Sequence, residues 1–274
     1  MLWKKKRKSG GDRPLFLVIR RRWLAAAGTA VMAAAILWAV NWPAAMNVSA
    51  SARQLPIYCV QREQKLVAIS FDAAWGNEDT QQLIDILARY QVPATFFVVG
   101  QWAEKYPESV KALHDAGHQV MNHSNTHAHY PQLSAQEVMD DLNACNDKIE
   151  AVTGVRPTLV RPPYGDYDDR SISAIRAAGM EPIQWDVDSL DWKGISAAEI
   201  TERVTKRVGP GSIVLFHNAG EHTPEALPGI LDHLLAQGYQ IVPISEIILT
   251  GDYTIDHTGR QFAAQTDEIG EAAS

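Results

Sequence analysis

Two histidines four residues apart, His123 and His127, are the first residues whose types and spacing indicate chemistry. On a helix, side chains four residues apart share one face, so the two imidazoles could bind one divalent cation. The pair alone says little, because the chain contains nine histidines. Three other motifs strengthen it, since each follows an apolar, strand-like run: S-F-D at 70–72, R-P-P-Y-G at 161–165 and L-F-H at 215–217. Barrel enzymes keep their catalytic groups at such strand ends, so one shared site is predicted.

The elements that must position these motifs alternate along the chain. We predict strands near residues 66–71, 94–99, 119–121, 158–160, 181–185, 212–216 and 240–243. Helices are predicted near 78–90, 101–116, 134–152, 168–178, 196–208 and 224–236. Such alternation predicts an α/β domain with a parallel sheet, open or closed. The domain is expected to cover residues 65–250, with a linker at 43–64 before it and a polar tail at 251–274 after it.

The first 42 residues indicate a single-pass membrane anchor. Residues 1–22 carry nine Lys or Arg and one Asp, a formal charge of about +8. Residues 23–42 contain no charged side chain, and a helix of that length spans about 30 Å, enough to cross a bilayer. Because the basic residues precede this span, residues 1–22 are expected in the cytoplasm and the domain outside the cell membrane. A cleaved signal is the alternative, since A-S-A at 50–52 resembles a cleavage site.

Charge and cysteine content narrow the possible partners. The net charge is −7, which leaves about −15 for the residues after 22. Phosphate contacts require Lys and Arg, so a nucleic-acid partner is not expected. Cys59 and Cys145 are too few for a disulfide framework, and their spacing does not show whether they are bridged.

Five motifs in order resemble the polysaccharide deacetylase family (carbohydrate esterase family 4, the NodB-homology domain) over residues 65–250. S-F-D-A at 70–73 stands where the family has T-F-D-D, and H-S-N-T-H at 123–127 matches H-S/T-x-x-H. R-P-P-Y-G at 161–165, D-S-L-D-W at 188–192 and L-F-H at 215–217 match the three later motifs. The resemblance implies a distorted (β/α) barrel with fewer than eight regular units.

The resemblance also implies roles in amide or ester hydrolysis. Asp72 would be the base that removes a proton from water, and Arg161 would keep Asp72 ionised. The backbone N–H of Tyr164 would help to bind the oxyanion. His217 would protonate the leaving amine, and Asp191 would hydrogen-bond the far nitrogen of His217 and favour its protonated form.

The metal site implied by the resemblance is incomplete. His123 and His127 would bind a divalent metal, most simply zinc, but Ala73 stands where the family has a metal-binding Asp. A catalytic zinc usually has three protein ligands. Glu78 or Asp79 could fold back as a third ligand, the two histidines could bind metal weakly with water, or the site could be metal-free.

Several other residues are open to more than one interpretation. Trp75, Trp185 and Trp192 either line a cleft that stacks sugars or belong to the core. His118 and His129 are predicted to lie in loops or on the surface. The segment F-D-A-A-W-G at 71–76 further resembles a branch of the family in spore-forming bacteria that is associated with spore cortex peptidoglycan and also lacks the second Asp.

These observations favour a membrane-anchored hydrolase that removes N-acetyl groups from amino sugars of peptidoglycan outside the cytoplasm. A catalytically inactive carbohydrate-binding relative is the first alternative, and a deacetylase of chitin-type oligosaccharides is the second. An acid and a base favour an enzyme, because a protein that only binds glycan needs neither.

Overall fold

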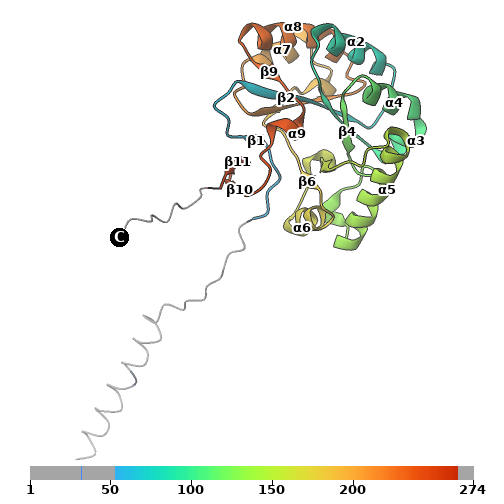
Figure 1. Ribbon diagram of the computed structural model, residues 1–274, viewed down its shortest axis with the longest axis vertical. Helices are drawn as coiled ribbons and strands as arrows, with labels where there is room; N and C mark the ends of the chain where they lie inside the picture. The colour runs from blue at the N-terminus through green and yellow to red at the C-terminus, as the bar shows by residue number, and fades with distance from the viewer. Residues whose placement is uncertain (1–31, 33–52, 265–274) are drawn as a thin grey trace, which may run out of the picture. The chain divides into compact units, whose positions relative to one another are not determined.

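The computed structural model describes residue 32 and residues 53–264 (Figure 1). The predicted cytoplasmic tail, the cleavage motif at 50–52 and, apart from residue 32, the predicted membrane segment lie outside these residues. Within the described part of the chain, no helix is both long and apolar enough to cross a membrane.

Residues 53–264 form a curled sheet with helices packed around its outer face (Figure 1). The strands are β1 (Cys59–Val60), β2 (Leu66–Ala73), β3 (Thr95–Val98), β4 (Gln119–Asn122), β5 (Leu159–Val160), β6 (Glu181–Pro182), β7 (Val187–Asp188), β8 (Ser212–His217), β9 (Gln240–Ile241), β10 (Tyr253–Ile255) and β11 (Arg260–Ala263). The helices are α2 (Thr80–Tyr90), α3 (Gly100–Lys105), α4 (Pro107–Asp115), α5 (Ala135–Thr153), α6 (Asp169–Ala177), α7 (Ala197–Thr205), α8 (Thr223–Ala236) and α9 (Ile244–Ile247). Short 3₁₀ turns are η1 (Tyr130–Gln132), η2 (Pro163–Gly165) and η3 (Asp191–Lys193).

Parallel pairing brings the sheet round into an irregular barrel. β8, β2, β3, β4, β5 and β6 are parallel neighbours in that order. The segment 181–188 then joins the two ends, because it pairs with β5 through β6 and with β8 through β7. Several strands have only two residues, so the units are uneven. The predicted distorted α/β barrel is confirmed.

Alternation along β2 separates the core from the site. Val67, Ile69 and Phe71 belong to the apolar cluster that contacts the surrounding helices, and Ala73 continues that series. Because successive strand residues point to opposite faces, Ser70 and Asp72 lie on the inner face. The catalytic candidate Asp72 therefore points into the barrel, whereas its neighbour Ala73 packs against the outer core.

The structure departs from the predicted elements in several places, and β7 and α9 were not predicted at all. The single helix expected over 101–116 is two helices that meet at Tyr106, because Pro107 has no N–H with which to continue α3. The sheet also extends beyond the predicted domain bounds of 65–250. β1 lies in the predicted linker and pairs with β8 and β11, and the β10–β11 hairpin lies in the predicted tail.

Candidate active site

The predicted catalytic motifs meet at the carboxyl ends of adjacent strands. Asp72 ends the inner face of β2 and is the direct cross-strand partner of His217 at the end of β8. His123 follows β4, and Arg161 follows β5. Residues that are up to 145 positions apart in the sequence are thus brought to one mouth of the barrel, as expected for parallel strands.

Asp72 is buried and paired with a buried cation. Its Oδ1 accepts a 2.6 Å hydrogen bond from Nη1 of Arg161, which is fully buried and lies with its guanidinium 4.2 Å from the centre of the Phe97 ring. Nη2 of Arg161 donates to Oγ of Ser70 at 2.8 Å. Burial would raise the pKa of Asp72 and is the largest single influence, but the charge and hydrogen bond of Arg161, together with the neighbouring imidazoles of His123 and His217, outweigh burial and hold that pKa below the ordinary 3.8. Asp72 is therefore an ionised base at neutral pH.

His217 has the opposite arrangement. Its Nδ1 donates to Oδ1 of Asp191 at 2.8 Å, and its backbone N–H donates to Oδ2 of the same carboxylate at 2.8 Å. The hydroxyl of Thr223, at the start of α8, donates to Oδ2 as well. Burial would lower the pKa of His217, but the hydrogen bond and charge of Asp191 raise it above the ordinary 6.5. His217 is therefore suited to carry a proton near neutral pH.

His123 and His127 lie close together, but not on a helix. Residues 123–129 form a loop in which Ser124 and His127 have the left-handed φ values of 69° and 58°. These turns, rather than one helical face, bring the two ring centres to 5.0 Å. The helical interpretation of the four-residue spacing was wrong, although the predicted proximity is present.

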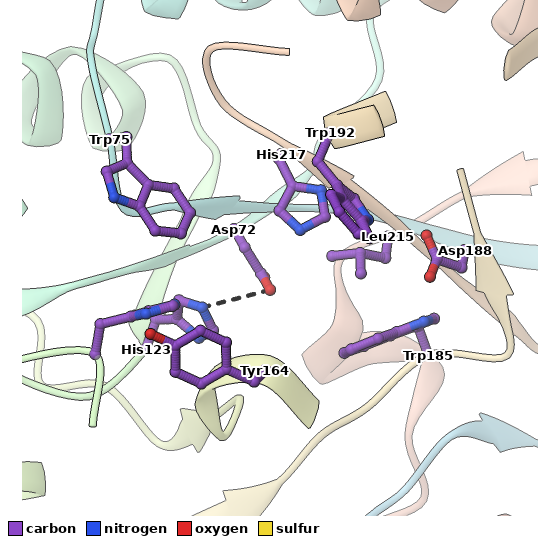
Figure 2. A pocket seen from close by; sticks show the side chains of 10 residues that line it. Asp72, Trp75, His123, Tyr164, Trp185, Asp188, Trp192, Leu215 and His217 are labelled. Carbon is purple, nitrogen blue, oxygen red and sulfur yellow. Dashed lines mark ion pairs between the residues drawn. The ribbon is translucent and has the colours of Figure 1, made fainter. Parts of the chain in front are cut away.

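The environment of His123 fixes which nitrogen faces the pocket. Its Nδ1 lies 2.7 Å from the carbonyl of Arg161, which can only accept, so Nδ1 carries the proton. Its Nε2 lies 3.5 Å from Oδ2 of Asp72, the contact drawn as a dashed line in Figure 2. Burial holds the pKa of His123 below its ordinary value and lowers that of His127 to about 4. Both rings are neutral at pH 7, so each has a nitrogen lone pair that can bind a metal or accept a proton from water.

An aromatic rim surrounds these groups. The pocket has a volume of about 420 Å³ and is lined by Asp72, Trp75, His123, His127, Tyr164, Trp185, Asp188, Trp192, Leu215 and His217 (Figure 2). Trp75, Trp192 and Tyr164 are each more than half exposed. All three tryptophans left open by the sequence line the pocket, and Trp185 also packs against the core, so a sugar-stacking role is favoured for Trp75 and Trp192.

The described residues do not fit a metal centre with three protein ligands. The methyl of Ala73 is buried in the outer core and points away from Asp72. Glu78 accepts from the backbone N–H of Asn77, and Asp79 accepts from that of Ala219, so neither folds back to the histidines. Across residues 53–264, no group of three or more His, Cys, Asp or Glu is arranged to hold a metal ion.

Some residues of the site had no clear signal in the sequence. Asn218 accepts a hydrogen bond from the N–H of Ala74 and donates to the carbonyls of Trp75 and Gly76, which ties the loop after β2 to the end of β8. Its place directly after the L-F-H motif is the only sequence feature that could have indicated this role. His118 lies in the loop before β4, as predicted, but it is buried, and burial lowers its pKa to about 4.

Comparison with known proteins gives the class to which this fold and site belong. A family model described as polysaccharide deacetylase matches residues 60–183. Peptidoglycan-N-acetylglucosamine deacetylase of Bacillus cereus is 32% identical over 188 residues, which cover 67% of this chain and 68% of that protein. The chain therefore belongs to the polysaccharide deacetylase family.

Two further relatives differ in what they imply. Peptidoglycan-N-acetylmuramic acid deacetylase PdaC of Bacillus subtilis is 37% identical over 188 residues, which cover 69% of this chain but only 40% of that protein. Among solved structures, a CE4 family pseudoenzyme from Bacillus anthracis is 35% identical with a TM-score of 0.68, over 71% of this chain and 69% of that one. The family thus includes both deacetylases and a protein described as a pseudoenzyme.

Proposed function

We propose that this protein is a hydrolase that removes N-acetyl groups from amino sugars of peptidoglycan. One observation carries the proposal: Asp72, an ionised carboxylate on β2, lies directly opposite His217 on the adjacent strand β8, and the pKa of His217 is raised. A base and an acid in these two states, at the floor of a pocket with an aromatic rim, are what amide hydrolysis requires.

The base side of the reaction follows from the contacts of Asp72. Arg161 occupies Oδ1 and leaves Oδ2 on the pocket side, near Nε2 of His123. A water molecule at Oδ2 would give its proton to Asp72 as its oxygen attacks the acetyl carbonyl. Arg161 stays charged throughout, so it orients Asp72 without competing for the proton.

The acid side follows from the contacts of His217. Asp191 holds Nδ1, so Nε2 is the nitrogen able to protonate the leaving amine. Collapse of the tetrahedral intermediate then breaks the C–N bond and releases acetate and the free amino sugar. Tyr164 is the candidate oxyanion donor, because its backbone N–H donates no hydrogen bond to another described residue.

Peptidoglycan is the proposed substrate because relatives from two Bacillus species are named for its two amino sugars. The predicted topology supports this, since residues 23–42 would anchor the domain outside the cytoplasm, where peptidoglycan lies. We place the protein at the cell membrane, and the likeness of residues 71–76 to the spore-associated branch favours spore cortex. Fractionation of the full-length protein tests the anchor. A soluble mature form that begins near residue 53 would show cleavage instead.

The direct test is acetate release by the purified protein. Fragments that contain muramic acid and oligomers of N-acetylglucosamine are compared, each with and without added divalent metal, and Asp72→Asn serves as the inactive control. Release from the peptidoglycan fragments is expected. Release from chitin-type oligomers alone would favour the chitin-type alternative.

A second candidate function has its own supporting observation. The metal ligand set is incomplete in residues 53–264, and a relative of 35% identity is described as a pseudoenzyme. A protein that binds glycan without cleaving it would keep the aromatic rim. Calorimetric binding of the same oligomers, with no acetate released under any metal condition, would establish this candidate.

A further inference from the structure

Tyr164 has a backbone conformation that its residue type does not favour. Its φ is +61°, in the left-handed region, where residues other than glycine are uncommon and are held by their surroundings. The side chain is 57% exposed, so burial in the core does not hold it. Gly165 and Asp166 donate backbone hydrogen bonds to the carbonyls of Pro162 and Pro163 on either side of it, and the remaining contacts that can constrain Tyr164 are those of its ring.

Two imidazoles contact the Tyr164 ring. His129 stacks on it with ring centres 4.0 Å apart and planes 10° from parallel, and His127 meets it edge-on at 4.4 Å. Nδ1 of His129 lies 3.0 Å from Oδ2 of Asp166, within hydrogen-bond distance. Asp166 follows Tyr164 by two residues, so the contact joins the loop after β4 to the loop after β5 that carries Tyr164.

We propose that His129 and Asp166 are positioning residues that hold Tyr164, and with it the backbone N–H, in place at the pocket. Neither residue lines the pocket, whereas Tyr164 does. Asp166 fixes the imidazole, the stacked imidazole fixes the phenol ring, and the ring fixes a left-handed backbone. This inference rests on the proposed function only for its kinetic consequence, since the contacts themselves do not depend on it.

The first experiment does not require turnover. In ¹⁵N-labelled protein, the backbone amide resonance of Tyr164 is compared between wild type, His129→Ala and His129→Phe. The Ala variant removes the stacked ring and should shift and broaden this resonance, because the left-handed conformation is no longer held. The Phe variant keeps a flat ring and should stay close to wild type. An unchanged Tyr164 resonance in the Ala variant overturns the proposal whether or not the protein is a deacetylase.

The second experiment measures how the loss of the His129 ring changes kcat and KM. Because an oxyanion donor acts mainly in the transition state, His129→Ala should lower kcat about tenfold while KM changes less than about twofold. His129→Phe should restore most of the rate, and Asp166→Asn, which keeps an acceptor, should be milder than Asp166→Ala. His233→Ala, an exposed histidine on α8, is the matched control and should be neutral. Equal loss in the Ala and Phe variants would contradict the stacking role.

A double-mutant cycle isolates the link through Tyr164. Glycine adopts a positive φ without strain, so the backbone of a Tyr164→Gly variant no longer depends on the contact with His129. His129→Ala should therefore lower kcat in the wild-type background but have almost no added effect in the Tyr164→Gly background. Full additivity of the two changes would show that His129 acts elsewhere. A wild type that releases no acetate would refute the proposed function, and the amide resonance would still decide this inference.

Discussion

Asp72 and Asp191 are two buried carboxylates of one site with partners of different kinds. Asp72 is paired with Arg161, which is charged at every relevant pH. Asp191 is paired with His217, which gains and loses a proton. In the first pair the cation lowers the pKa of the carboxyl, and in the second the carboxylate raises the pKa of the imidazole.

This difference gives a base and an acid on adjacent strands opposite protonation states. Asp72 and His217 are direct partners on adjacent parallel strands, so their surroundings are nearly shared. The charged partner of each group differs. Arg161, which pairs with Asp72, follows β5, and Asp191, which pairs with His217, lies in the turn after β7. Neighbouring groups can therefore have opposite protonation states, because different partners reach them from other parts of the barrel.

The largest expected effect comes from removing the base or the acid itself. Asp72→Asn and His217→Ala should each lower the rate of acetate release by about 10²–10⁴, because loss of a general acid or base typically costs that much. Circular dichroism should show that both variants remain folded. If either variant kept wild-type activity, the assignment of that residue as base or acid would be wrong.

Removing the permanent cation should cost stability as well as activity. Arg161→Met leaves Asp72 buried without a partner, and breaking a buried pair in this way costs about 3–5 kcal/mol. Arg156→Met is the matched control, because Arg156 makes exposed ion pairs with Asp147 and Glu150 that are worth at most about 1 kcal/mol. The free energy of unfolding, measured by chemical denaturation, should show this contrast.

The pH dependence of that stability has a defined sign. In the wild type the pKa of Asp72 is depressed, so its contribution is present above 3.8 and is lost as pH falls through the lower folded value. Without Arg161, burial favours the protonated carboxyl. The loss in free energy of unfolding caused by Arg161→Met should therefore be larger at pH 7 than at pH 5. A loss that does not depend on pH would show that lost packing, not charge, explains it.

Changing the titrating pair should move one limb of the pH–rate profile. The folded pKa of His217 is raised, so its protonated form and the associated stability persist above 6.5 and are lost as pH rises through the higher folded value. Asp191→Asn removes the charge that raises this pKa, so the alkaline limb of kcat should move to lower pH. The acidic limb, set by Asp72, should stay in place and serves as the internal control. Movement of both limbs would mean that the two pairs are not independent.

The smallest effect on the acid–base comparison is expected from His123 and His127, the two histidines that the sequence predicted to bind a metal. With only His123 and His127 available, zinc uptake should be weaker than at a site with three protein ligands. Replacing both with Ala should abolish whatever uptake calorimetry or elemental analysis detects in the wild type. His222 and His233, replaced together, form the matched control pair. Equal uptake in both double variants would place any metal away from the base and acid.

The sequence by itself determined much of the site and its frame. The alternation of strand-like and helical segments predicted a parallel sheet, open or closed, and the resemblance of the motifs predicted that it forms a distorted barrel. The motifs placed Asp72, Arg161, Asp191 and His217 at strand ends, and the structure brings all four together. Their catalytic roles remain predictions that the experiments above test.

Only the tertiary structure decided which groups meet across long separations. The left-handed residues Ser124 and His127 replace the expected helical turn, and a conformation of this kind depends on contacts that spacing does not encode. The stack of His129 on Tyr164, and the outward direction of Ala73, likewise follow from how loops and faces are packed. Local patterns record which residues are buried and where strands end. Which partner sets the charge of Asp72 or His217, and which ring contacts Tyr164, depends on how the strands and loops pack together in the barrel.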